Sequence, residues 1–258
     1  MRTRCSWALK RTNGPRRWVF KMKFEERYSC LPGDALPQEI VLLMGRGCFY
    51  KKCSFCDYHM DSGPDAQSIP LNNRVLDQVT GAFSRLVVLN SGSYFELPGA
   101  TRDRVLEICR QKNIRHLHME SHWLLREKTQ ALKNELAEEG IALHPRIGIE
   151  TFDEQYREEI MRKGMGYNRT PEAIAEIYDE CCLLFGMTGQ SPEQFEEDIA
   201  IAAKYFSRVY VNIFNDNSTA VKADPALIRW FTEYALPGLK KAPKICVLIN
   251  NTDLGVGD

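Results

Sequence analysis

Apolar runs of strand length alternate with longer, polar-faced stretches along most of this chain. The first run covers residues 39–44, and similar runs recur ahead of each polar-faced stretch. Such alternation predicts repeated βα units and a parallel sheet, because neighbouring parallel strands must be joined by helical crossovers. The expected strands cover residues 39–44, 85–90, 116–120, 141–150, 181–186 and 209–214, with an edge strand at 245–250.

The stretches between these strands carry helix signals. Thr170 before Pro171 and Ser191 before Pro192 are typical of helix starts, and Gly140 is typical of a helix end. The expected helices cover residues 74–83, 102–111, 126–139, 153–162, 171–180, 192–206 and 225–234. Six consecutive βα units predict an α/β fold, a partial (β/α)6 TIM-like barrel in a single domain over residues 23–258.

Composition narrows the class of protein. The chain has 258 residues, 44% of them hydrophobic, and it contains no run of the roughly 20 apolar residues that a membrane span needs. No apolar signal-peptide core is visible, and nine cysteines in a chain of this length do not suggest a secreted disulfide scaffold. We therefore expect a cytoplasmic protein in a reducing compartment, with no membrane partner.

Charge separates the first residues from the rest. Residues 1–23 carry eight Lys or Arg and no acid, so the remainder has a net charge of −8. An acidic body argues against nucleic acid as a partner, because phosphate binding depends on clustered basic side chains. We interpret residues 1–22 as a disordered basic arm or a spurious extension, since Met22 resembles a natural start. An arm that tethers RNA is the alternative.

Three cysteines, Cys48, Cys53 and Cys56, follow the first expected strand within nine residues. Three thiolates on one loop can bind three irons of a [4Fe-4S] cluster and leave the fourth iron open. In a barrel this loop lies at the carboxyl ends of the strands, where the chemistry collects. A structural zinc site with His59 as fourth ligand, or a disulfide, are the other interpretations.

These residues resemble the radical S-adenosylmethionine (SAM) enzymes. Those enzymes carry an aromatic residue before the third cysteine, as Phe55 stands here, although their usual spacing of three and then two residues is four and then two in this chain. Asn90-Ser91-Gly92-Ser93 resembles their amine-binding motif. Gly148-Ile149-Glu150-Thr151 resembles the coproporphyrinogen oxidase and elongator-like branches. Residues 184–193 resemble the turn beside the adenine. The resemblance covers about residues 38–215.

The resemblance implies a reaction and a set of ligands. A reduced cluster would cleave SAM to methionine and a 5′-deoxyadenosyl radical, which abstracts hydrogen from a substrate. The cysteines would bind iron, residues 90–92 the methionyl amine, and Arg146, or alternatively Lys51, the carboxylate. Glu120 and Glu150 would meet the ribose. The implied cofactor-binding residues are Phe55, Asn90, Ser91, Gly92, Glu120, Arg146, Glu150, Gly186 and Met187.

Substrate-facing residues are expected at the same end of the barrel. Period-two alternation puts His118, Glu120 and His122 on one face, which makes His118 and Glu120 candidates for proton transfer. The expected substrate-binding residues are Tyr94, Glu96, His122, Asn212 and Asn215. Packed histidines and Asn-rich turns are the alternative interpretations.

The sequence shows no second cysteine cluster and no appended domain, which favours a small-molecule substrate. The compact chain and the Asn-Ser-Gly-Ser motif are similar to queuine lyases, radical enzymes that fragment queuine to a 7-deazaguanine precursor. The resemblance implies a 7-deazapurine substrate and an electron donor such as flavodoxin or ferredoxin. An RNA-modifying radical enzyme and a non-catalytic zinc or iron-sulfur protein are the alternatives.

Overall fold

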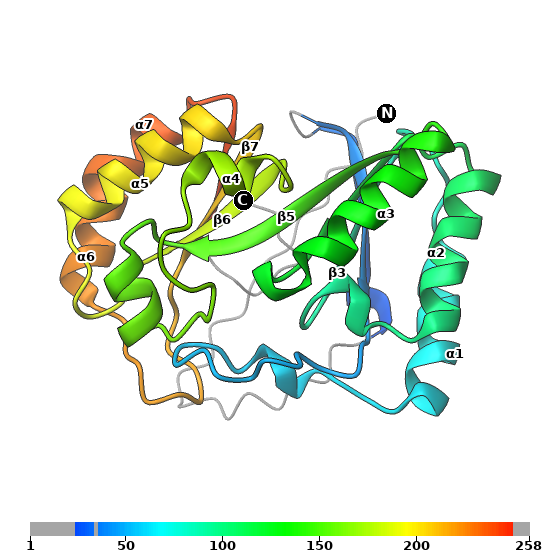
Figure 1. Ribbon diagram of the computed structural model, residues 1–258, viewed down its shortest axis with the longest axis horizontal. Coiled ribbons are helices and arrows are strands. Elements are labelled where there is room, and N and C mark those ends of the chain that lie inside the picture. The colour runs from blue at the N-terminus through cyan, green and yellow to red at the C-terminus, as the bar shows by residue number, and fades with distance from the viewer. Residues whose placement is uncertain (1–23, 34–35, 250–258) are drawn as a thin grey trace.

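A computed structural model describes residues 24–33 and 36–249 of the chain. Its strands form one sheet in the order β1 to β8, and the sheet curls into a half barrel with helices on its convex face (Figure 1). β1 runs antiparallel to β2, and every later neighbour is parallel. The strands are β1 (Tyr28–Leu31), β2 (Gln38–Leu43), β3 (Arg85–Asn90), β4 (His116–Glu120), β5 (Ala142–Glu150), β6 (Glu180–Phe185), β7 (Arg208–Ile213) and β8 (Ile245–Leu248).

Helices connect the parallel strands in the expected order. The α-helices are α1 (Asp65–Leu76), α2 (Gly99–Gln111), α3 (Arg126–Glu138), α4 (Pro171–Ala175), α5 (Pro192–Tyr205), α6 (Pro225–Trp230) and α7 (Leu236–Leu239). Short 3-10 turns are η1 (Phe24–Glu26), η2 (Tyr58–Met60), η3 (Tyr94–Glu96) and η4 (Trp123–Leu125), and π-helical turns are η5 (Tyr156–Ile160) and η6 (Phe231–Ala235). The predicted partial barrel of six βα units with an edge strand is confirmed.

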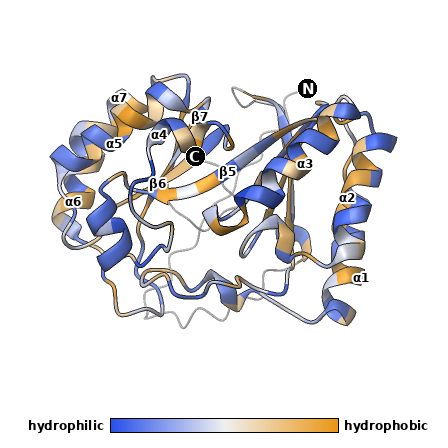
Figure 2. Cartoon of the chain, viewed as in Figure 1, coloured by the Kyte–Doolittle hydropathy of each residue, from blue (hydrophilic) through white to orange (hydrophobic). Residues whose placement is uncertain are grey.

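The main hydrophobic core lies between the sheet and its helices. Val41 and Leu43 of β2 pack in it with Val105 of α2, and a second part of this core joins β5, β6 and β7 to α5. Figure 2 shows hydrophilic and hydrophobic residues alternating along α2 and α5, as expected for helices that cover a sheet on one side. Alternate strand residues therefore face the concave side of the half barrel.

Three expected helices differ from the structure. The first spans Asp65–Leu76 rather than 74–83, although Pro70 lies inside it. Pro70 removes one backbone donor, but buried contacts of Asn72, Val75 and Leu76 outweigh that cost. Residues 153–162 form mainly the π-turn η5, and α4 ends at Ala175, because residues 178–180 lead into β6.

The strand β1 was not expected. It begins just after Arg27, which is fully buried, so the fold includes residues from Phe24 onward. The expected basic arm, residues 1–22, lies outside the described residues. Within the described ranges, no helix combines the length and apolarity that crossing a bilayer requires.

Candidate active site

The cysteine segment, residues 44–64, crosses the carboxyl ends of the strands between β2 and α1 (Figure 1). Cys53 and Cys56 pack against a small apolar cluster that includes Phe55, Met161 and Met187. Burial is the main cause that raises the pKa of Cys53 to about 11 and that of Cys56 to about 12. As free thiols they stay protonated at neutral pH, so binding iron would displace their protons.

Segments far away in sequence hold this loop in place. The backbone N–H of Ser54 donates to Met161 O at 3.0 Å, and the Ser54 hydroxyl donates to Ile160 O at 2.6 Å. From the other side, Asn217 Nδ2 donates to Phe55 O at 2.7 Å. The three cysteines thus lie on a loop fixed between the segments that follow β5 and β7.

The geometry gives no support for a single-ion site at the cysteines. In the part of the chain that the structure describes, no three side chains of His, Cys, Asp or Glu converge where one metal ion could sit. A zinc site with His59 would need such convergence, whereas a four-iron cluster spreads its ligands over separate irons.

The loop after β3 lies directly against the cysteine loop. A Cβ on Gly92 would clash with Glu96 Oε2 and come within 3.1 Å of Cys48 Cα, so a side chain here would push these neighbours away. Asn90 Nδ2 donates to Ser93 O at 3.0 Å, while the buried Asn90 Oδ1 has no hydrogen-bond partner. A free buried acceptor in the motif that contacts Cys48 fits the amine of a methionyl group, because such an oxygen is costly to bury unpaired.

Two predicted substrate residues in this region have structural roles. The Tyr94 side chain is 1% exposed and packs in the core behind the sheet, because it sits on η3 facing the helices. Glu96 accepts hydrogen bonds from the backbone N–H groups of Ser93 and Phe49. The expectation that Tyr94 faces substrate is wrong. Glu96 joins the loop after β3 to the cysteine loop, and its contact with substrate stays a prediction.

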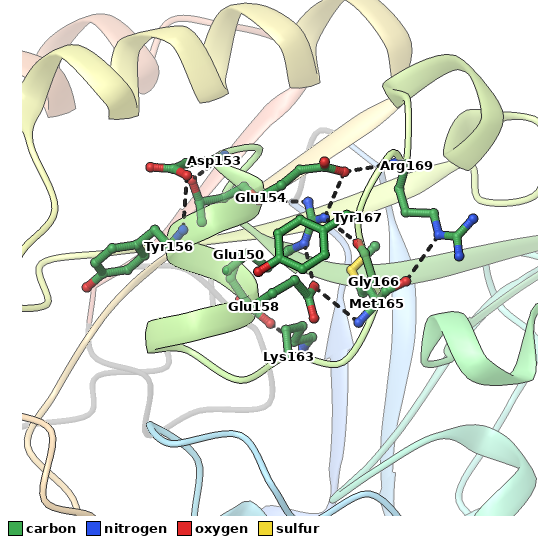
Figure 3. A network of polar contacts seen from close by, with 12 residues as sticks. Glu150, Asp153, Glu154, Tyr156, Glu158, Lys163, Met165, Gly166, Tyr167 and Arg169 are labelled. Atoms are coloured by element: carbon green, nitrogen blue, oxygen red, sulfur yellow. Dashed lines mark hydrogen bonds and ion pairs between the residues drawn. The ribbon is translucent and has the colours of Figure 1, made fainter.

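Glu150, at the end of β5, forms an ion pair with Lys163. Lys163 Nζ lies 2.6 Å from Glu150 Oε1, and it also lies 5.8 Å from the centre of the Phe55 ring. Burial opposes the charge of Lys163, but Glu150 and Cys53 raise its pKa above the usual value. Figure 3 shows this pair at one end of a polar network that continues to Glu154 and Arg169. A cation therefore lies beside the cysteines.

Arg146 lies between two carboxylates of the chain. Its Nη2 lies 3.0 Å from Glu180 Oε2, its Nη1 lies 3.5 Å from Glu120 Oε1, and its guanidinium lies 3.5 Å above the Tyr210 ring. This buried guanidinium is neutralised by the two carboxylates, and its pairing with a methionyl carboxylate stays a prediction.

His118, on the concave face, is another correction. Its Nδ1 lies 2.9 Å from Glu180 Oε1 and its Nε2 lies 2.6 Å from Arg85 Nη1. Because both ring nitrogens are engaged, the expected proton transfer to substrate has no free nitrogen to use. Burial is the main cause that lowers the pKa of His118 to about 4.

His122 and the two asparagines lie in different settings. The His122 ring stacks on Tyr50 of the cysteine loop with ring centres 5.1 Å apart, and Nε2 lies 2.9 Å from Lys163 O. Asn212 is half-buried on the concave side of β7. Asn215 is exposed and donates to Ile213 O at 3.2 Å, which is turn chemistry.

The end of β6 also meets the cysteine loop. Gly186 has φ 101°, a conformation that favours glycine, and Met187 is fully buried in the apolar cluster with the cysteines. Met187 therefore packs in one cluster with Phe55 of the cysteine loop. A contact of either residue with SAM remains a prediction.

Sequence reasoning missed Lys163 and Asn217, which touch the cysteine segment from other loops. A weak signal for Lys163 was available. Lys163 directly precedes Gly164 and is followed closely by Gly166, and closely spaced glycines after a helical stretch are typical of a turn.

Comparison with known proteins decides the family. No protein-family model matches the sequence, and no curated protein does. Among solved structures, the queuine lyase from Clostridium spiroforme, bound to SAM and queuine, is 40% identical over 90% of this chain and 99% of its own, with a TM-score of 0.83. The chain belongs to the family of this queuine lyase, within the radical SAM enzymes.

Membership in the radical SAM enzymes agrees with the loop geometry. At the carboxyl ends of the strands, Cys53 and Cys56 share one apolar cluster, and Cys48 lies against Gly92 of the loop that carries the free Asn90 Oδ1. The residues present therefore fit a cluster with SAM beside it, and the protein is an enzyme of this class.

Proposed function

We propose that this chain is a queuine lyase, which uses SAM and a [4Fe-4S] cluster to break a C–N bond of queuine and release a 7-deazaguanine product. The observation that carries the proposal is the 40% identity to a queuine lyase across 99% of that enzyme. The half barrel and the cysteine loop at the carboxyl ends of its strands support the proposal. The loop would hold the cluster, and the concave face of the half barrel would hold the substrate.

Cys48, Cys53 and Cys56 would bind the cluster. Asn90 Oδ1 would accept a hydrogen bond from the methionyl amine, and the small Gly92 keeps the loop close to Cys48. Lys163 adds a buried cation beside Cys53, where it would offset negative charge near the cluster. When bound, SAM and the reduced cluster supply the radical that abstracts hydrogen from the substrate.

The electron donor is part of this proposal. Lys51 and Lys52 are exposed on the cysteine loop, so a positive patch of the surface lies close to the cysteines. A flavodoxin or ferredoxin with an acidic face would approach this patch under electrostatic attraction.

Anaerobic reconstitution tests the proposal. The protein would be loaded with iron and sulfide, reduced, and incubated with SAM and queuine, and the products would be measured by mass spectrometry. We expect methionine, 5′-deoxyadenosine and a 7-deazaguanine product, and none of them from Cys53→Ala. SAM cleavage with queuine left intact would refute the substrate, and absence of any cleavage would refute the cofactor chemistry.

A further inference from the structure

The concave face of the half barrel has an apolar part and a charged part. Ile40, Val87 and Leu89 of β2 and β3 form a hydrophobic cluster on this face. The next strands, β4 to β6, contribute the charged part, with His118, Glu120, Arg146 and Glu180. A flat heterocycle fits such a surface, because its ring face can pack on aliphatic side chains while its edge forms hydrogen bonds.

Most of the charged groups satisfy one another. Both oxygens of Glu180 are used, one by His118 Nδ1 at 2.9 Å and the other by Arg146 Nε at 3.1 Å. The Arg146 guanidinium also stacks on Tyr210. These side chains form a closed structural unit with little capacity for a ligand.

Glu120 differs from its neighbours. The shortest approach of its carboxylate to a cation is 3.5 Å, to Arg146 Nη1, and the described residues give it no shorter hydrogen bond. Its side chain is 36% exposed, against 3% for Glu180. It still lies deep in the concavity, so burial raises its pKa. Glu120 therefore has unused acceptor capacity on the face where a substrate must lie.

We propose that Glu120 recognises the base of the substrate by accepting two hydrogen bonds from the guanine-like edge of a 7-deazapurine. This inference rests on the proposed function. A 2-amino-4-oxo ring presents a ring N–H and an amino group side by side, and a carboxylate is an acceptor for both. Arg146 is the positioning residue, because its ion pair with Glu180 fixes the guanidinium beside which Glu120 lies.

Binding measurements with matched ligands test this assignment. Calorimetry would compare queuine with its 2-desamino counterpart, which lacks the amino donor, on the reconstituted protein. We expect the wild type to prefer queuine about 10- to 100-fold, the range for a bidentate contact to a base edge. In Glu120→Gln and Glu120→Ala the preference should fall below about 3-fold, because the paired acceptors are lost.

A control variant and two control measurements test whether the lost preference is specific to Glu120. Glu127 is 88% exposed on α3, so Glu127→Gln should keep the full preference of the wild type. The affinity for SAM should stay unchanged in both Glu120 variants, and thermal unfolding would show that they are folded. Unchanged preference for queuine in the Glu120 variants, or lost affinity for SAM instead, would overturn the assignment.

The proposed function fails in a different way. If the wild type binds neither ligand, the queuine substrate itself is wrong, and the assignment of Glu120 falls with it. If the wild type cleaves queuine but the Glu120 variants still discriminate against the 2-desamino ligand, only the assignment of Glu120 is refuted.

Discussion

Glu96 accepts a hydrogen bond from the backbone N–H of Phe49, 47 residues earlier in the chain. Its other carboxylate oxygen accepts from the N–H of Ser93. One side chain therefore connects the loop after β3 to the residue that follows the first cysteine.

We predict that Glu96→Ala weakens the cysteine loop. Two backbone N–H groups lose their acceptor, which costs about 1–3 kcal/mol of unfolding free energy for each group that stays buried. Iron and sulfide bound per chain after anaerobic reconstitution should fall below the wild-type value. Glu96→Gln keeps one carbonyl oxygen, so its iron and sulfide content should lie between those of the wild type and Glu96→Ala. Full cluster loading of Glu96→Ala would contradict this role of Glu96.

The ion pair of Glu150 and Lys163 allows a double-mutant test. Their side chains are 10% and 12% exposed, so Lys163→Met leaves a nearly buried carboxylate without its cation. We expect a loss of about 3–5 kcal/mol in unfolding free energy, measured in urea. The double variant Glu150→Gln with Lys163→Met should recover part of that loss. A loss in the double variant equal to the sum of the losses in Lys163→Met and in Glu150→Gln alone would show that the pair is not coupled.

A second buried pair closes the cysteine segment against β1. Arg27 Nη2 lies 3.0 Å from Asp61 Oδ1, and the Arg27 side chain is 0% exposed. Arg27→Met should destabilise the fold by about 3–5 kcal/mol, also in high salt, since buried pairs are screened less than surface pairs. Arg27→Lys keeps the charge but loses the hydrogen bond from Nη1 to Leu42 O, so a smaller loss is expected. A loss that vanishes in 1 M salt would contradict burial of the pair.

We expect the stability of the fold to depend on pH through the carboxyl group of Asp198 in α5. Burial, partly offset by the N–H of Phe152, raises its pKa from 3.8 to about 6. The folded state therefore holds this proton more tightly than the unfolded state. The contribution of Asp198 to the free energy of unfolding is greatest below pH 4 and falls as pH rises to 6. The loss is about 3 kcal/mol at most.

Asp198→Asn removes this titration and keeps an oxygen that can accept from Phe152 N–H. Urea unfolding at pH 4.5 and pH 7.5 should show a smaller decline with pH in the variant than in the wild type. The same decline in both proteins would assign the effect to another group.

Periodicity and capping predicted the sheet well because they act locally. The strand over residues 116–120 matches β4 at both ends, and the Ser191-Pro192 start of α5 is capped as expected. The placement of α1 was wrong, since the contacts of Asn72 with Met44 that stabilise this helix come from outside it.

The candidate site was predictable only in part. The cysteine loop and the Asn90 motif were visible from residue types in order, and the structure brings them together at Gly92 and Cys48. The alternation of β4 correctly turns Glu120 toward the concave face, yet it cannot show that Arg85 and Glu180 use both nitrogens of His118. Partners on other strands decide which of these polar groups remains free.

The contact between Asn217 and Phe55 joins residues 162 positions apart. Contacts of such long range form late, because most of the chain must be ordered before the two ends meet. This anchor of the cysteine loop requires the segment that follows β7 to be in place. Iron delivery during synthesis would therefore meet an unfinished site, and maturation with iron and sulfide should follow folding of the full chain.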